Sequence, residues 1–161
     1  MNPNDSISKA RALPSGAVFY RCALQVNPYH YGATFRGKAA GGDASAHAKA
    51  IVEKAAEIGV SVLAITDHND VSGVPAFRSA AAARGIHIFP GFELSSSEGV
   101  HVLCIYPQDT DDARLGRFLG EFGITNTTPS SDLSNKSLVE ILRKVREQGG
   151  VAVAAHVTND N

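Results

Sequence analysis

The chain has 161 residues, of which 43% are hydrophobic and 19% charged, as expected for one domain with a substantial core. A net charge of −1 and a pI of about 6.6 argue against a strong electrostatic attraction to nucleic acid or to a membrane surface. No apolar stretch approaches the ~18 residues of a membrane-spanning helix, and Met1–Gly16 lacks the apolar core of a secretory signal.

Residues 1–16 are polar and expected to be flexible, and a single domain is predicted over residues 17–161. The first half is predicted to contain, in chain order, a strand at Ala17–Val26, a long loop at Asn27–Gly42, a helix from a cap at Asp43 or Ser45 to Ile58, a strand at Val60–Thr66 and a helix at Pro75–Arg84. The second half is predicted to contain a strand at Ile86–Phe89 that Pro90-Gly91 breaks, a strand at Val100–Tyr106, a helix at Asp111–Phe122, a helix from a cap at Ser134 or Asn135 to Gln148, and a strand at Val151–Ala155.

The order of these elements predicts an α/β fold. Alternating strands and helices imply parallel strands joined by right-handed crossovers, and strands such as Val60–Thr66 lack the polar alternation of a half-exposed sheet. The two cysteines, Cys22 and Cys104, lie in apolar runs without CxxC spacing, which favours buried free thiols in a reducing cytoplasm.

Titratable side chains follow or lie within several of the predicted strands. They are Asp67, His68, Glu93, His101 and His156. One histidine beside an apolar strand is more often structural than a metal ligand. Several histidines and carboxylates placed at strand ends, however, favour a metal site of mixed nitrogen and oxygen ligands. Ser95–Ser97 are interpreted as turn residues, and the basic residues at 136, 143, 144 and 146 as a solvated helix face.

Three segments, ITDHNDVSGV, FPGFELSSSEGVHVLCIY and AVAAHV, resemble motifs of the PHP (polymerase and histidinol phosphatase) domain. The resemblance runs from about Phe19 to His156. It implies a distorted (β/α)7 barrel of PHP type, here partial, with covering helices, up to three divalent metal ions and phosphoester hydrolysis. The opening FYRCALQVNPYHYGATFRG also resembles PHP domains fused to AAA-type ATPases, which implies a covalently linked ATPase domain.

The sequence departs from the family at both ends. Where the family has Asp-Leu-His-x-His, the chain has Ala23-Leu24-Gln25-Val26-Asn27, and the closing Asp-x-His motif would lie beyond Asn161, so a C-terminal truncation is expected. His30 is interpreted as standing near an early Asp ligand of the family. Gln25 and Asn27 could offer neutral oxygen ligands, which suit hard cations better than zinc-like ions.

Carried over by residue, the resemblance implies one site rather than a trinuclear centre. Glu93, His101 and His156 would hold one ion, with His68 as a further ligand and Asp67 and His68 as catalytic residues. The implied ion is manganese, zinc or iron. The predicted function is a metal-dependent phosphoesterase acting on a phosphorylated small molecule or a nucleic-acid end. A catalytically degenerate PHP-like binding or regulatory module stays open as the alternative.

Overall fold

The structure, a computed structural model, describes residues 19–29, 43–126 and 128–156. Within these residues the elements are β1 (Cys22–Val26), α3 (Ala44–Glu57), β2 (Val62–Ile65), α4 (Val74–Ala81), β3 (His87–Ser95), β4 (His101–Ile105), α5 (Asp112–Gly120), α6 (Leu138–Glu147) and β5 (Val151–Ala154). The predicted α/β class and partial barrel are therefore confirmed. Most of the predicted loop at Asn27–Gly42, including His30, lies outside the described residues.

The five strands form one curled sheet in sequence order, β1-β2-β3-β4-β5. β1, β2 and β3 are parallel, but β4 is antiparallel to β3, and β5 is antiparallel to β4. The prediction of parallel strands throughout was thus wrong for β4 and β5. A tight turn without a crossover helix connects β3 to β4 between Ser95 and His101. After β4 the chain runs through α5 and α6 and starts β5 at Val151, beside Ile105 at the C-terminal end of β4, so β5 runs antiparallel to β4.

β3 also differs from its prediction, because it continues through Pro90-Gly91 to Ser95. Pro90 is the last β3 residue paired with β2, so its missing N–H falls where that ladder ends, while its carbonyl accepts from Tyr106. Gly91 is required by close packing: a Cβ there would lie 2.4 Å from the backbone oxygen of Cys104 on β4. The glycine therefore brings two strands together instead of ending one.

Local side-chain chemistry sets the starts of three helices. Asp43 and Asp111 cap α3 and α5 by accepting the backbone N–H groups of Ala46 and Arg114. Ser137 and Glu140 form a capping box at α6. The predicted caps at Ser134 or Asn135 were wrong, because the Ser134 hydroxyl donates to Phe122 O and so belongs to the preceding turn.

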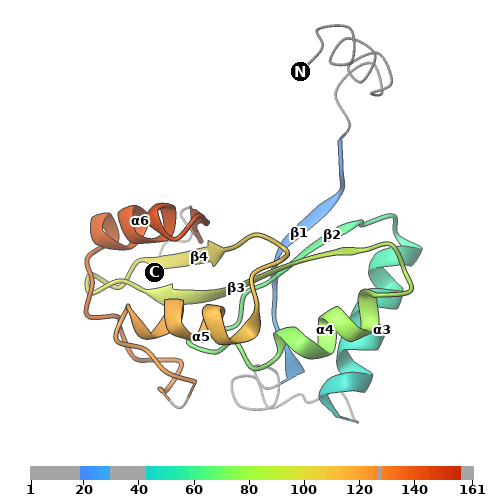
Figure 1. The fold of residues 1–161 in the computed structure, drawn as a ribbon, viewed down its shortest axis with the longest axis horizontal. Coiled ribbons are helices and arrows are strands. Elements are labelled where there is room, and N and C mark those ends of the chain that lie inside the picture. The colour runs from blue at the N-terminus through green and yellow to red at the C-terminus, as the bar shows by residue number, and fades with distance from the viewer. Residues whose placement is uncertain (1–18, 30–42, 127, 157–161) are drawn as a thin grey trace, which may run out of the picture.

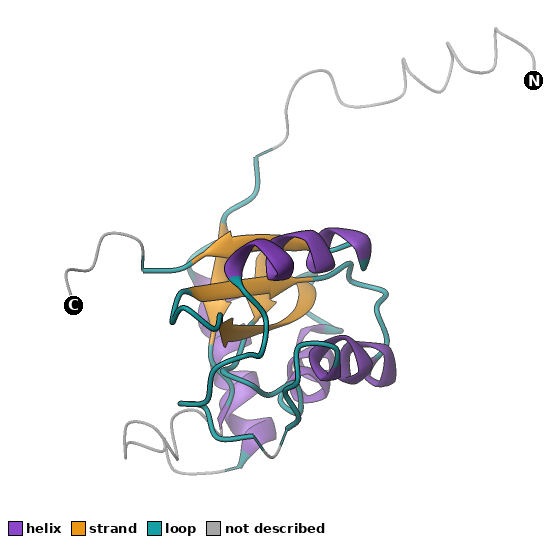
Figure 2. Ribbon diagram, turned by 90° about the vertical axis from the view of Figure 1, so that its left-hand side faces the viewer, coloured by secondary structure: helices purple, strands orange, loops and turns teal. Residues whose placement is uncertain are grey.

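One face of the sheet carries the hydrophobic core. We call it the core face; it includes Leu63, Ile65, Phe92, Leu94 and Val102. Side chains of α3, α4, α5 and α6 join these residues in a single buried cluster. Figures 1 and 2 show the helices arranged around the strands. Burial of the core face thus holds the strands in register, which leaves the residues at the strand ends available for a functional site.

We call the opposite face of the sheet the inner face, and it has an apolar groove. This groove of about 410 Å³ is lined by alternate strand residues that include Leu24, Val62, Phe89, Ile105 and Val151. Leu24 and Val151 are exposed in it. Among the described residues, no helix is both long and apolar enough to cross a membrane.

Candidate metal centre

The turn after β2 places the first candidate ligand. His68 forms a parallel bridge with Glu93, Glu93 N–H donates to Asp67 O at 2.8 Å, and Asn69 N–H donates to Glu93 O at 2.9 Å. Asn69 has φ 55°, in the left-handed region that asparagine tolerates better than most residues. Its amide donates to the carbonyls of Pro129 and Asp132, which fixes the turn. The backbone of His68 is therefore held beside that of Glu93.

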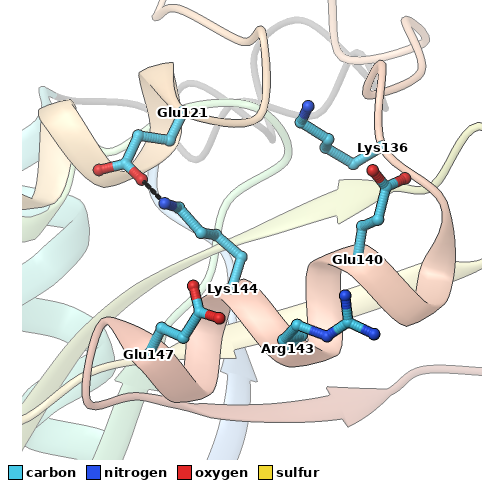
Figure 3. A pocket seen from close by; sticks show the side chains of 6 residues that line it. All are labelled: Glu121, Lys136, Glu140, Arg143, Lys144 and Glu147. Atoms are coloured by element: carbon cyan, nitrogen blue, oxygen red, sulfur yellow. Dashed lines mark ion pairs between the residues drawn. The ribbon is translucent and has the colours of Figure 1, made fainter.

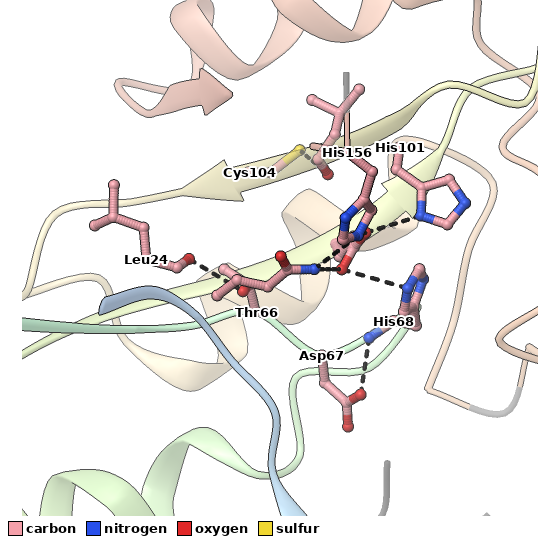
Figure 4. Close-up of polar contacts among 10 residues, drawn as sticks. Leu24, Thr66, Asp67, His68, His101, Cys104 and His156 are labelled. Atoms are coloured by element: carbon pink, nitrogen blue, oxygen red, sulfur yellow. Dashed lines mark hydrogen bonds and ion pairs between the residues drawn. The ribbon is translucent and has the colours of Figure 1, made fainter. Parts of the chain in front are cut away.

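Glu93 is the centre of the site, and its side chain is fully buried. Its carboxylate lies 3.3 Å from His68 Nε2, 2.9 Å from His101 Nδ1 and 3.7 Å from His156 Nε2. The His101 ring lies 5.0 Å from the His68 ring and 5.7 Å from the His156 ring. Figure 4 shows the rings of His68, His101 and His156 gathered close together. The side chains of His101 and His156 are 39% and 46% exposed, whereas His68 is at 8%, so the site is open on one side.

Gln25 reaches the same carboxylate from β1. Its Nε2 donates to Glu93 Oε2 at 2.7 Å and lies 3.2 Å from His156 Nε2. Gln25 was predicted to be able to offer a neutral oxygen ligand, but its amide nitrogen faces the cluster. His156, with φ 55°, follows β5 in a left-handed conformation that turns its ring toward Gln25 and Glu93.

Burial controls the protonation of the turn. Desolvation lowers the pKa of His68, with the Glu93 carboxylate opposing and the neighbouring imidazoles adding to the decrease, so His68 is neutral near pH 7. Burial raises the pKa of Asp67 to about 7. The Asp67 carboxylate accepts the His68 backbone N–H at 2.8 Å and points away from the imidazoles, which makes it a positioning group in this geometry (Figure 4).

The donor set fits a divalent metal ion. One ligand atom from each of His68, Glu93 and His101 lies within 4.8 Å of the other two. Two imidazole nitrogens and a carboxylate oxygen form the mixed set that zinc, manganese and iron accept. A carboxylate with no solvent exposure is costly unless a positive charge or several donors compensate it. This cluster differs from the predicted trio of Glu93, His101 and His156, because His68 lies inside it and His156 at its margin.

Other predicted features have structural roles. The Ser96 hydroxyl accepts the N–H groups of Glu98 and Val100, as the interpretation of Ser95–Ser97 as turn residues required. Cys104 is buried, and burial raises its pKa strongly, but Cys22 is exposed, contrary to prediction, because it lies at the start of an edge strand.

The basic helix face is part of a mixed-charge hollow of about 440 Å³. It is lined by Glu121, Lys136, Glu140, Arg143, Lys144 and Glu147. Acids and bases alternate around it, and Lys144 pairs with Glu121 (Figure 3). Because the acidic and basic side chains balance, the hollow has no excess of positive charge that would attract an anionic polymer.

The fold and the cluster define an α/β protein with a candidate metal centre at the ends of its strands. A family model of the PHP domain matches residues 39–152, more than half of the chain. The chain therefore belongs to the PHP domain family, as the motifs predicted. Gln25 and His156 lie outside the matched residues.

One curated relative matches part of the chain. The chain is 28% identical over 106 residues to an uncharacterized protein of Methanocaldococcus jannaschii, covering 66% of this chain and 49% of that protein. The chain thus spans about half the length of the curated relative it matches.

Two solved structures share the fold. One is a candidate metal-dependent phosphoesterase of Bifidobacterium adolescentis, at TM-score 0.50 and 16% identity, covering 87% of this chain and 67% of the other. The second is an amidohydrolase of Chromobacterium violaceum with bound sulfate and no metal, at TM-score 0.50 and 18% identity, covering 85% and 67%.

Proposed function

We propose that this chain carries the metal centre of a metal-dependent phosphoesterase, acting on a phosphorylated small molecule or a nucleic-acid end. The observation that carries the proposal is the buried Glu93 carboxylate with His68, His101 and His156 around it. Membership of the PHP family supports it, and so does the description of the Bifidobacterium protein.

The residues have distinct roles in this proposal. A divalent ion bound there would lower the pKa of a coordinated water to near ~7 and stabilise charge on phosphoryl oxygens. Glu93, His68 and His101 supply the ligands, and the lowered pKa of His68 favours the neutral ring that a ligand imidazole must have. Asp67 fixes the His68 backbone. His101 and His156 border the solvent-open side, so a phosphate ester would approach past them.

Hydrolysis by the metal-loaded chain tests the proposal. The chain, loaded separately with manganese, zinc or iron, would be assayed with a nitrophenyl phosphate monoester, the corresponding diester and a 5′-phosphorylated oligonucleotide. Glu93→Gln keeps the side-chain shape and removes the charged ligand, while Glu57→Gln makes the same change on the exposed surface of α3. We expect metal-dependent hydrolysis in wild type and Glu57→Gln and none in Glu93→Gln. Equal hydrolysis in all three proteins would contradict the proposal.

A binding or regulatory module, possessing the metal centre without hydrolysis, is the second candidate. The contact of the Gln25 amide with Glu93 and His156 favours it, because these atoms are then not free to act as ligands. A covalently linked ATPase domain, proposed from the opening sequence, would suit this role. Stoichiometric metal binding with no turnover of any of the three substrates would select this candidate.

A further inference from the structure

We infer that the Gln25 side-chain amide occupies a cation position beside Glu93 and limits the centre to one metal ion. The inference rests on the metal binding in the proposed function but not on hydrolysis. It concerns how many ions the site accepts, and its evidence lies in the backbone of β1 and in the atoms that the amide contacts.

A β-bulge directs Gln25 into the site. Ala23 pairs with Leu63 and Val26 with Ile65, so β1 contains one residue more than β2 between these pairs. In an uninterrupted register Gln25 would pair with Ile65 and face the core. The bulge instead puts Val26 on the core face and turns Gln25 to the inner face, where Glu93 lies. Bulges that redirect one side chain are common beside functional sites.

The contacts of Gln25 are those of a small cation. Its amide nitrogen is placed to donate one N–H to Glu93 Oε2 at 2.7 Å and the other to His156 Nε2 at 3.2 Å. An amide nitrogen has no lone pair to offer, so His156 Nε2 must accept, and its proton then resides on Nδ1. The reverse orientation would place an amide oxygen against a carboxylate, which is repulsive. The two lone pairs that accept from the Gln25 amide, on Glu93 Oε2 and His156 Nε2, are the lone pairs with which a metal ion at this position would be bound.

The remaining ligands are sufficient for one ion. His68, Glu93 and His101 form the compact trio, and the Gln25 amide lies against Glu93 Oε2 and His156 Nε2. A second ion held by Glu93 Oε2 and His156 Nε2 would have to displace the amide that contacts both atoms. An imidazole at position 25 would offer a lone pair where the amide offers protons.

The test counts metal ions in the full chain. Three variants are compared with wild type after manganese loading: Gln25→His adds a ligand, Gln25→Met removes the donors without adding nitrogen, and Leu24→His adds a histidine to the neighbouring, exposed position. The Leu24 side chain is exposed, lines the apolar groove and points away from His68, His101 and His156 in Figure 4, so it is a matched control. Elemental analysis gives stoichiometry, and electron paramagnetic resonance detects coupling between manganese ions at the ~3.5–4 Å spacing of two-metal sites.

We expect one ion per chain in wild type and Leu24→His and two coupled ions in Gln25→His. Gln25→Met frees Glu93 Oε2 and His156 Nε2 without adding a nitrogen ligand, so we expect it to take a second ion only at a higher manganese concentration than Gln25→His. Circular dichroism establishes that each variant is folded. Two ions in wild type, or one ion in a folded Gln25→His, would overturn the inference while leaving the proposed function intact. No ion in wild type and none in Gln25→His would overturn both. Two coupled ions in Gln25→His with no hydrolysis in wild type would support the inference and contradict the phosphoesterase proposal.

Discussion

The buried carboxyl of Asp67 predicts an inverted dependence of stability on pH. The residue is 4% exposed, and burial raises the pKa of its carboxyl from 3.8 to about 7. Between these values the folded state holds a proton that the unfolded state has released, so the free energy of unfolding falls as pH rises. A shift of about 3 units at ~1.36 kcal/mol per unit amounts to about 4 kcal/mol, an upper value, developing between pH ~4 and ~7 and constant above.

Asp67→Asn tests this reasoning, because the asparagine oxygen can still accept the His68 N–H while the titration is removed. Urea unfolding of metal-free protein at pH ~4 to ~8 should show the variant gaining stability relative to wild type as pH rises, by up to about 4 kcal/mol. Asp109→Asn, on the exposed surface, should track wild type. Parallel profiles for wild type and Asp67→Asn would refute a buried proton on Asp67.

Three further substitutions test the site, the sheet and a helix cap. His101→Ala should lose stoichiometric metal in equilibrium dialysis; retained binding would place the ligands elsewhere. Gly91→Ala should lower stability by ~1–3 kcal/mol in urea unfolding, since its Cβ would meet Cys104 O, whereas Gly116→Ala on α5 meets nothing within 4 Å and should be neutral or stabilising. Ser137→Ala should cost ~1 kcal/mol in thermal unfolding; no change would mean that the capping box is dispensable.

The sequence located the elements because their signals are local. Asp43, one of the two predicted caps, starts α3, and the helix ends with its C-cap at Ile58, where the prediction ended it. Strand direction was missed because it depends on where a connection returns, and α5 and α6 look like a crossover in sequence although they bring the chain back to the end of β4. Pro90-Gly91 was taken for a break because its signal is the same whether a strand ends or a neighbour approaches closely.

The site divides in the same way. The sequence predicted Glu93 and the histidines at strand ends, and the structure brings them to one carboxylate. The contact of Gln25 could not be predicted from the pattern. It depends on a one-residue bulge in β1 and on the amide orientation, neither of which leaves a periodic signal in the sequence. A polar residue within an otherwise apolar strand was the one available hint.

The turn that reverses β3 into β4 also has a consequence for the order of folding. Glu93 and His101 are only 8 residues apart, whereas Gln25 lies 68 residues from Glu93 and 131 from His156. A hairpin forms in ~1–10 μs, while contacts of large sequence separation are slow because long loops must close. The centre would thus be nucleated by its own hairpin and completed by the two edge strands, β1 and β5. Amide hydrogen exchange should then be slowest in β3 and β4 and fastest in β1 and β5, and uniform protection across the sheet would contradict this order.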